Sequence, residues 1–146
     1  MFKKLIIVGF IVFLLSCTGN NQNRVSRSDV EAFMDEYYEN IKPFDFKSIE
    51  SYYSETMFIN TSKEEWEDLL NRMHTILDEL ISVELQSWNT RSNLSTSGSG
   101  TTYTLVYKTI YKNGEVTETV VLFVPRGTKD IGIIGQHFNS NAFLGL

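Results

Sequence analysis

Apolar residues in the first half of the chain recur at the spacing of helices. Ser28 and Glu31 have the spacing of a capping box, in which each side chain satisfies a free backbone N–H of the first helical turn. A helix is therefore predicted from residue 28, and Pro43 ends it because the residue before a proline is disfavoured in the helical conformation. Its buried face is predicted to carry Val30, Phe33, Met34, Tyr37 and Ile41. A short second helix is predicted after Asp45, which is a good N-terminal cap.

The clearest amphipathic pattern lies at residues 63–81. Ser62 and Glu65 form a second capping box immediately before and within its first turn. The apolar stripe of this segment consists of Trp66, Leu69, Leu70, Met73, Leu77 and Leu80, and charged residues lie on its other faces. The pattern predicts a long helix with one face packed on a core.

Beyond Ile81 the apolar spacing changes from helical to alternating, which indicates strands. Four strands are predicted, at residues 83–88, 101–112, 115–124 and 129–139. The second places Tyr103, Leu105, Tyr107 and Tyr111 on one face. Asn113-Gly114 predicts a tight hairpin, because both central residues of a type I′ turn need positive φ. Gly132 and Gly135 in the last strand indicate a bend or the close approach of another backbone.

These elements predict one α+β domain over residues 28–140. N-terminal helices are followed by a four-stranded antiparallel meander, and the helices must cover one face of the sheet, because neither layer can bury its apolar surface alone. Residues 141–146 are left as a C-terminal tail.

The N-terminus has the pattern of a secretory signal. Lys3 and Lys4 precede an apolar run at residues 5–15, which is much shorter than the ~20 residues that a helix needs to cross a bilayer core. The run ends in Leu14-Leu15-Ser16-Cys17, which resembles the bacterial lipobox, and Cys17 is the only cysteine in the sequence. The alternative is an ordinary signal peptide followed by a chance cysteine. The resemblance implies a signal peptide at residues 1–16 and, on Cys17, a thioether-linked diacylglyceryl group, usually with a third acyl chain on the amine.

Lipid on Cys17 would anchor the protein to a membrane without spanning it, because two or more acyl chains hold stably in a bilayer. Thr18 stands where lipoproteins retained in the inner membrane carry Asp, so the resemblance favours the outer membrane, facing the periplasm. A Gram-positive host stays open. The polar residues that follow Cys17 predict a flexible tether over residues 17–27.

The charge of the chain argues against nucleic acid as a partner. Removal of residues 1–16 takes Lys3 and Lys4 away, so that 11 basic residues face 18 acidic ones and the net charge is near −7. An acidic chain without a cluster of Lys and Arg repels a phosphate backbone.

The order of elements resembles the nuclear transport factor 2-like superfamily, α+β folds in which a strongly curved sheet wraps a long helix. The resemblance covers roughly residues 28–140 and rests on the helix at 63–81, the hairpin at Asn113-Gly114 and the closing strand 130–138. It implies a cone-shaped domain with a concavity. Members include ketosteroid isomerase-like and dehydratase-like enzymes, and many more binding or accessory domains. No catalytic residue carries over to a position in this chain, and fold analogy does not establish function.

Local motifs of catalysis are absent from the sequence, including the phosphate-loop, H-E-x-x-H, G-x-S-x-G and C-x-x-C patterns. With two histidines and no free thiol, no metal site and no cofactor are predicted. His137 shares a predicted strand face with Ile131, Ile133 and Gly135. If that face lines the concavity, the imidazole is placed for acid–base work; the alternative is a solvated or hydrogen-bonded histidine at a strand end.

Aromatic side chains are the other candidates for a site. They provide the apolar walls, and in tyrosine the polar tips, that ligand pockets usually have. The candidate pocket residues are Tyr52, Tyr53, Phe58, Trp66, Tyr103, Tyr107, Phe123 and His137. The alternative is that the aromatics fill a core.

The sequence favours a non-enzymatic envelope domain that binds a small apolar ligand or another envelope protein. A second hypothesis is a small pocket enzyme of the isomerase or dehydratase type that uses His137 or a pocket tyrosine. A third is a structural protein that self-associates, for example as a homodimer through its sheet face. The state of the cavity distinguishes them, because a filled cone excludes both a ligand and a reaction inside it.

Overall fold

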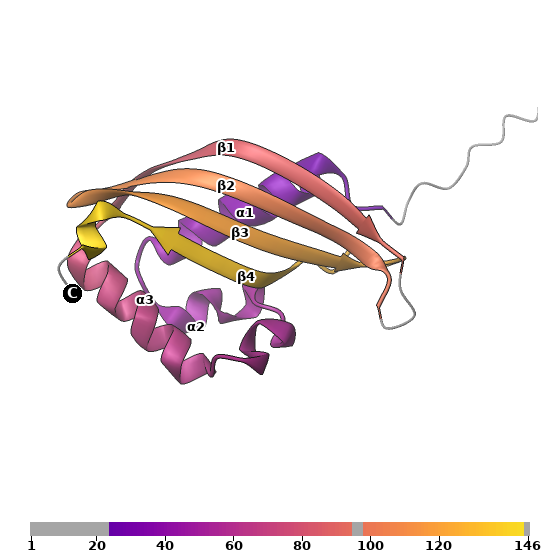
Figure 1. Cartoon of the computed structure of the whole chain (residues 1–146), viewed down its shortest axis with the longest axis horizontal. Coiled ribbons are helices and arrows are strands. Elements are labelled where there is room, and N and C mark those ends of the chain that lie inside the picture. Colours follow the sequence, from indigo (N-terminus) through magenta and orange to yellow (C-terminus); the bar gives the residue numbers. More distant parts are fainter. Residues whose placement is uncertain (1–23, 95–97, 145–146) are drawn as a thin grey trace, which may run out of the picture.

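The computed structural model describes residues 24–94 and 98–144, and it confirms the predicted α+β class (Figure 1). In this part of the chain the helices are α1 (Arg27–Ile41), α2 (Phe46–Ile49) and α3 (Lys63–Leu77), with short 3₁₀ helices η1 (Glu50–Tyr52), η2 (Glu55–Ile59) and η3 (Asn141–Phe143). The strands are β1 (Leu80–Asn93), β2 (Gly100–Tyr111), β3 (Gly114–Pro125) and β4 (Gly132–Asn139). The predicted signal peptide, Cys17 and most of the predicted tether lie outside the described residues.

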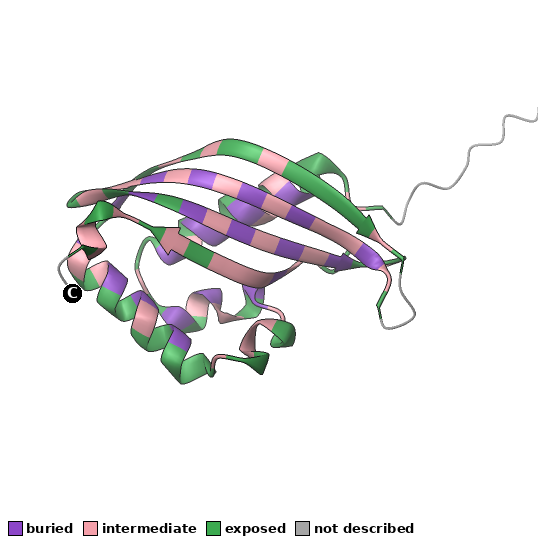
Figure 2. Ribbon diagram, viewed as in Figure 1, coloured by how far each residue is buried: buried purple, intermediate pink, exposed green. Residues whose placement is uncertain are grey.

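The four strands form one antiparallel sheet in the order β1-β2-β3-β4, which is the predicted meander. Figure 1 shows a curved sheet with α1 behind it and with α2 and α3 beyond its β4 side. Figure 2 shows buried residues alternating with less buried ones along β2 and β3, as expected for strands with one face on a core. Ring contacts join the layers: Tyr38 of α1 packs edge-on against Tyr107 of β2, with ring centroids 5.1 Å apart.

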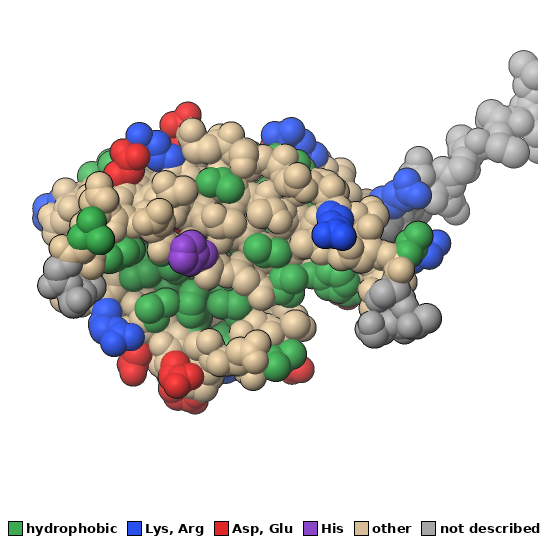
Figure 3. Space-filling model, viewed as in Figure 1, with side chains coloured by type: hydrophobic (Ala, Val, Ile, Leu, Met, Phe, Trp, Pro, Cys, Tyr) green, Lys and Arg blue, Asp and Glu red, His purple; other side chains and the backbone are tan. Residues whose placement is uncertain are grey.

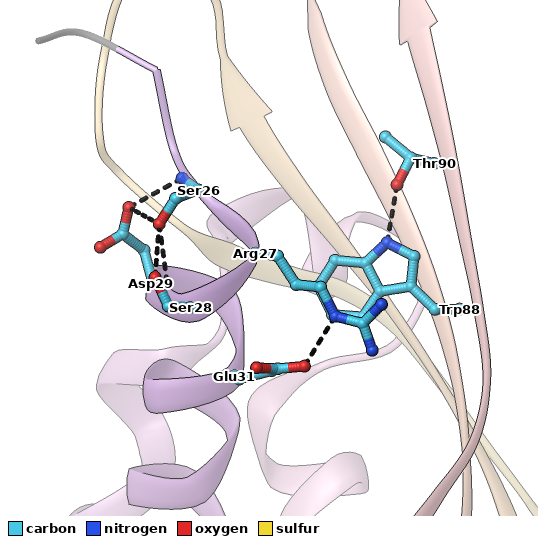
Figure 4. Close-up of polar contacts among 7 residues, drawn as sticks. All are labelled: Ser26, Arg27, Ser28, Asp29, Glu31, Trp88 and Thr90. Atoms are coloured by element: carbon cyan, nitrogen blue, oxygen red, sulfur yellow. Dashed lines mark hydrogen bonds and ion pairs between the residues drawn. The ribbon is translucent and has the colours of Figure 1, made fainter.

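Helix α1 starts earlier than the sequence pattern predicts. Its N-cap is Ser26 and not Ser28: the Ser26 hydroxyl accepts from the N–H of Asp29, whose carboxylate accepts from the N–H of Ser26 at 2.7 Å (Figure 4). Glu31, the other half of the predicted capping box, accepts from Arg27 Nε at 2.8 Å instead. Two overlapping Ser-x-x-acid patterns occur here, and the sequence alone does not choose between them.

The start of α1 is tied to the sheet by Arg27. Its guanidinium lies 4.8 Å from the centre of the Trp88 ring on β1, within the range of a cation–π contact. Trp88 Nε1 in turn donates to Thr90 Oγ1 at 2.8 Å (Figure 4). The earlier helix start therefore brings Arg27 onto the first strand.

Helix α3 begins as predicted and ends earlier. The Ser62–Glu65 capping box is present, with Glu65 N–H donating to Ser62 Oγ at 3.1 Å. The helix ends at Leu77 and not near residue 81, because Asp78 adopts φ 62 and ψ −145, which turns the chain into β1. Leu80, which continues the apolar spacing of the helix, is the first residue of that strand.

The β2–β3 hairpin forms where Asn113-Gly114 predicts one, but its turn is different. Tyr111 pairs with Gly114, so the central residues are Lys112 and Asn113, and none of the turn residues has positive φ. The N–H groups of Lys112 and Asn113 donate to the carbonyls of Glu79 and Leu77 at 2.9 and 3.0 Å. Contact with the end of α3 therefore sets the shape of this turn in place of the type I′ geometry.

Candidate binding groove

An apolar groove lies between α3 and β4. It holds about 720 Å³ of open space, within the range of roughly 300–1,000 Å³ that is usual for ligand sites. Figure 3 shows hydrophobic side chains gathered between these two elements on one face of the molecule. The lining residues are Trp66, Leu69, Arg72, Met73, Thr75 and Ile76 of α3, Gln136, His137 and Phe138 of β4, and Phe143 of η3.

The helix side of the groove comes from a second apolar row on α3. Trp66, Leu70, Met73 and Leu77 form the buried row and pack into the core, and Trp66 and Met73 also border the groove. Leu69 and Ile76, seven residues apart and hence on one face, are only partly buried. The apolar surface of α3 is therefore wider than the core that it covers, and the excess forms one wall of the groove.

A β-bulge decides which side chains of β4 face inward. Ile133 pairs with Leu122 and Gly135 pairs with the neighbouring Val121, which leaves Ile134 as an extra residue. The predicted bend at the glycines of this strand is thus present. Beyond the bulge the inward positions are Gln136 and Phe138, and Phe138 packs on Trp66 with ring centroids 6.1 Å apart.

His137 lies on the opposite face from the one expected, because the bulge shifts the alternation by one residue. It pairs with Thr119, its side chain is exposed, and it reaches the groove only at the rim. The predicted strand face is therefore wrong: the folded strand does not place His137 on one face with Ile131, Ile133 and Gly135. A histidine in this position does not point into the concavity.

Most of the other predicted pocket residues fill the interior of the domain. Buried side chains of the core include Tyr52, Tyr53, Trp66, Tyr103 and Tyr107. Phe58 is partly buried beside Tyr53, and Phe123 lies on the outer face of the sheet next to the inward-facing Leu122. Of the eight candidates, Trp66 and His137 line the groove. A cavity of about 20 Å³ elsewhere between helices and sheet has room for roughly one water molecule.

A hydrogen-bonded polar network lies beneath the groove floor. The hydroxyls of Tyr37 and Tyr53 are 2.9 Å apart, and Tyr53 donates to Gln136 Oε1 at 2.8 Å. Gln136 Nε2 donates to Tyr37 Oη at 2.9 Å and also to Glu118 Oε1. Gln136 thus connects the groove to a fully buried carboxyl group on β3.

Burial raises the pKa of Glu118 to about 7, because the charged carboxylate loses its hydration. Gln136 and Tyr38 oppose this by favouring the carboxylate, although the Tyr38 hydroxyl is not in hydrogen-bond geometry with any described group. Burial also raises the pKa values of Tyr37 and Tyr53, so both stay protonated at neutral pH and act as donors. Glu118 lines neither the groove nor the 20 Å³ cavity.

Neither the groove nor the buried acid is among the sequence predictions, although the sequence contains a signal for the acid. Glu118 lies on the inward-facing side of β3, at one of the alternate positions where Val116, Val120, Leu122 and Val124 are all buried. A charged residue at such a position marks either a polar network or a functional group. The groove has no comparable signal, because Phe143 comes from the predicted tail and Phe138 depends on the bulge.

Two further features of the described residues bear on the site. No helix in residues 24–94 and 98–144 is long and apolar enough to cross a membrane. Within the same ranges, no three His, Cys, Asp or Glu side chains are grouped as a metal ion would require.

Comparison with known proteins identifies no relative. No family model, no curated protein and no solved structure matches this chain. The groove and the N-terminal sequence are therefore the features that indicate a function.

Proposed function

We propose that this protein is a lipid-anchored envelope lipoprotein whose domain binds an apolar ligand in the groove between α3 and β4 without catalysing a reaction. The groove is the observation that carries the proposal. It is open and apolar, and exposed apolar surface of this kind is characteristic of binding sites. The Leu14-Leu15-Ser16-Cys17 pattern supports the anchor and, with Thr18, an outer-membrane location.

A nuclear transport factor 2-like assignment belongs to this proposal. The helix-then-meander order and the curved sheet support it. Aromatic side chains fill the interior of the domain, so the ligand site in this proposal lies at the β4 edge. Binding members of that superfamily then offer a closer analogy than its enzymes.

The enzyme alternative has less support. Its acid–base candidate, His137, is exposed at the groove rim with no hydrogen-bond partner among the described residues that would orient it. Glu118 has a pKa suited to proton transfer, but it lies behind Gln136 and does not line the groove. The self-association alternative also has less support, because threonines at positions 102, 104, 117 and 119 lie among the apolar Val106, Val121 and Phe123 on the outer sheet face.

The test uses residues 17–146 with Cys17→Ser, which retains every described element without lipid. The probe is 1-anilinonaphthalene-8-sulfonate, an apolar fluorophore whose negative charge suits Arg72 on the groove wall. We expect the probe to bind, and Ile76→Glu to weaken binding by about tenfold or more, because it places a charge in the apolar groove. Ile59→Glu is the matched control, since Ile59 is 73% exposed and lines no groove.

Circular dichroism checks that both variants keep the helical signal of the parent protein. Equal probe affinity in the Ile76→Glu and Ile59→Glu proteins, or no binding to the parent, would refute groove binding. Native mass spectrometry of the parent protein from cells then reports the mass of any ligand that copurifies.

A further inference from the structure

Strand β4 is an edge strand, and most of its outer edge is uncovered. Only its N-terminal end is covered among the described residues. There the Ser54 N–H donates to the Ile133 carbonyl at 2.9 Å, in a parallel bridge formed by Tyr53 and Ile133. An antiparallel strand turns the N–H and C=O groups of successive residues alternately to its two sides. Because Ile133 turns its carbonyl outward, its partner Leu122 turns its own backbone groups away from β4.

The same alternation gives the direction of the backbone groups beyond the bulge. Gly135 and His137 pair with residues of β3 that turn toward β4, so these two are bonded within the sheet. Gln136 and Phe138 therefore turn their N–H and C=O groups to the outer edge. No hydrogen bond to these backbone groups across that edge occurs among the described residues.

The uncovered edge and the apolar groove are the same place. Gln136 and Phe138 both line the groove, and α3 forms its opposite wall. An unpaired edge is a template for an added strand, and added strands combine backbone hydrogen bonds with pockets for alternate side chains. Side chains on the inner face of such a strand would contact Phe138, Met73 and Ile76.

The charged residues of the groove indicate which kind of occupant it binds. Arg72 and His137 are its titratable lining residues, and no Asp or Glu lines it. Arg72 forms no ion pair with a described residue. A carboxylate on the occupant would complement this site. A second copy of the chain paired through β4 would instead bring its own Arg72 and His137 to the same interface.

We propose that the groove binds an extended apolar segment of another polypeptide, which adds to β4 as a fifth strand and places a carboxylate at Arg72. The inference rests on the proposed function and specifies its ligand class. Affinity comes from the backbone groups of Gln136 and Phe138, and selectivity comes from alternate apolar side chains and one acidic group.

The test is selection of random displayed 12-residue peptides on residues 17–146 carrying Cys17→Ser. We expect enriched peptides to have apolar residues at alternate positions and an acidic residue or a free C-terminus. In synthetic copies, N-methylation at alternate residues should cost about tenfold in affinity where the N–H faces β4, and little at the residues between. Arg72→Gln should weaken binding several-fold, and Arg91→Gln, on the outer face of β1, should not.

The outcomes separate this inference from the proposed function. If the anionic fluorophore binds in the groove and no peptide is enriched, or if N-methylation has no effect at any position, strand addition is refuted and groove binding stands. If neither probe binds, both proposals fail. Sedimentation of the unliganded protein as a dimer that Phe138→Glu dissociates would identify a second copy as the occupant and overturn the inference.

Discussion

Glu118 is an ionisable residue buried at a position that otherwise suits an apolar side chain. It takes an apolar position on β3, is fully buried, and has the Gln136 amide as its hydrogen-bond donor. An unpaired buried carboxylate is costly, so the group retains its proton to a much higher pH than usual. The stability of the folded protein should therefore depend on pH through this one side chain.

The sign of that dependence follows from the raised pKa. The pKa of Glu118 is about 7 in the folded protein against an ordinary 4.5, so folding favours the protonated form. Its contribution is fully present below about pH 4.5 and is lost as the pH rises through 7. We expect Glu118→Gln to raise the free energy of unfolding by on the order of 3 kcal/mol at pH 8 and to change it little at pH 4.

Urea denaturation at the two pH values measures this difference. Glu115→Gln is the control on the same strand, because Glu115 is exposed and pairs with Lys108 at 2.8 Å, a contact worth at most about 1 kcal/mol. If Glu118→Gln has the same effect at pH 4 and pH 8, the raised pKa is wrong.

Gln136 is the residue that joins the two parts of the site. The amide group of its side chain forms hydrogen bonds with Tyr53, Tyr37 and Glu118. The same side chain also lines the groove. A ligand that draws on this amide would alter the hydrogen bonding of Glu118. The buried acid and the groove thus share one side chain, that of Gln136.

At the scale of elements, the N-terminal cap of α1 is hard to identify from the sequence. Ser26 and Ser28 each precede an acidic residue by three positions, and only Ser26 caps α1. The position of the cap fixes the rotation of the first turn and hence the contact between Arg27 and Trp88.

A pair of substitutions tests the position of this cap. We expect Ser26→Ala to lower the free energy of unfolding by about 1 kcal/mol, because an N–H of the first turn loses its acceptor. Ser28→Ala should stay within about 0.5 kcal/mol, as most exposed substitutions do. Thermal and urea unfolding of the two variants measure both values, and the reverse order would restore Ser28 as the cap.

Strand β4 is the element that most determines the site. Its bulge turns Gln136 and Phe138 inward and His137 outward, and its place at the sheet edge leaves backbone groups beside the groove. One inserted residue therefore changes both the wall of the groove and the identity of the polar group that reaches it.

At the scale of the whole molecule, the proposed anchor and the groove belong to different parts of the chain. The proposed lipidation site is Cys17, and the described structure begins at Arg24 and enters α1 at Arg27. In Figure 1, α1 enters the fold near the end of the sheet away from the C-terminus. Lipid at Cys17 would hold the domain at a membrane surface and leave the α3–β4 face for a ligand.

The anchor is tested directly in cells. We expect Cys17→Ala to abolish labelling by an alkyne-tagged fatty acid and to release the protein from the membrane fraction, because the acyl chains provide the membrane affinity. Thr18→Ala is the adjacent control and should keep the label. Labelling of the Cys17→Ala protein would mean that the lipid, if any, is attached elsewhere.

The local pattern of the sequence determined the order and type of the elements. Apolar spacing of 3.6 and of 2 residues distinguishes the helices from the strands, the Ser62–Glu65 box forms as expected, and α1 ends at Ile41, shortly before Pro43. These signals act through neighbouring residues. Only the tertiary structure decided the cap of α1, the end of α3, the shape of the hairpin turn and the bulge in β4. These depend on contacts between distant residues, as when Leu77 and Glu79 accept from the hairpin turn. The aromatics fill a core and the groove lies at the sheet edge for the same reason, since packing between layers determines which apolar surface remains exposed.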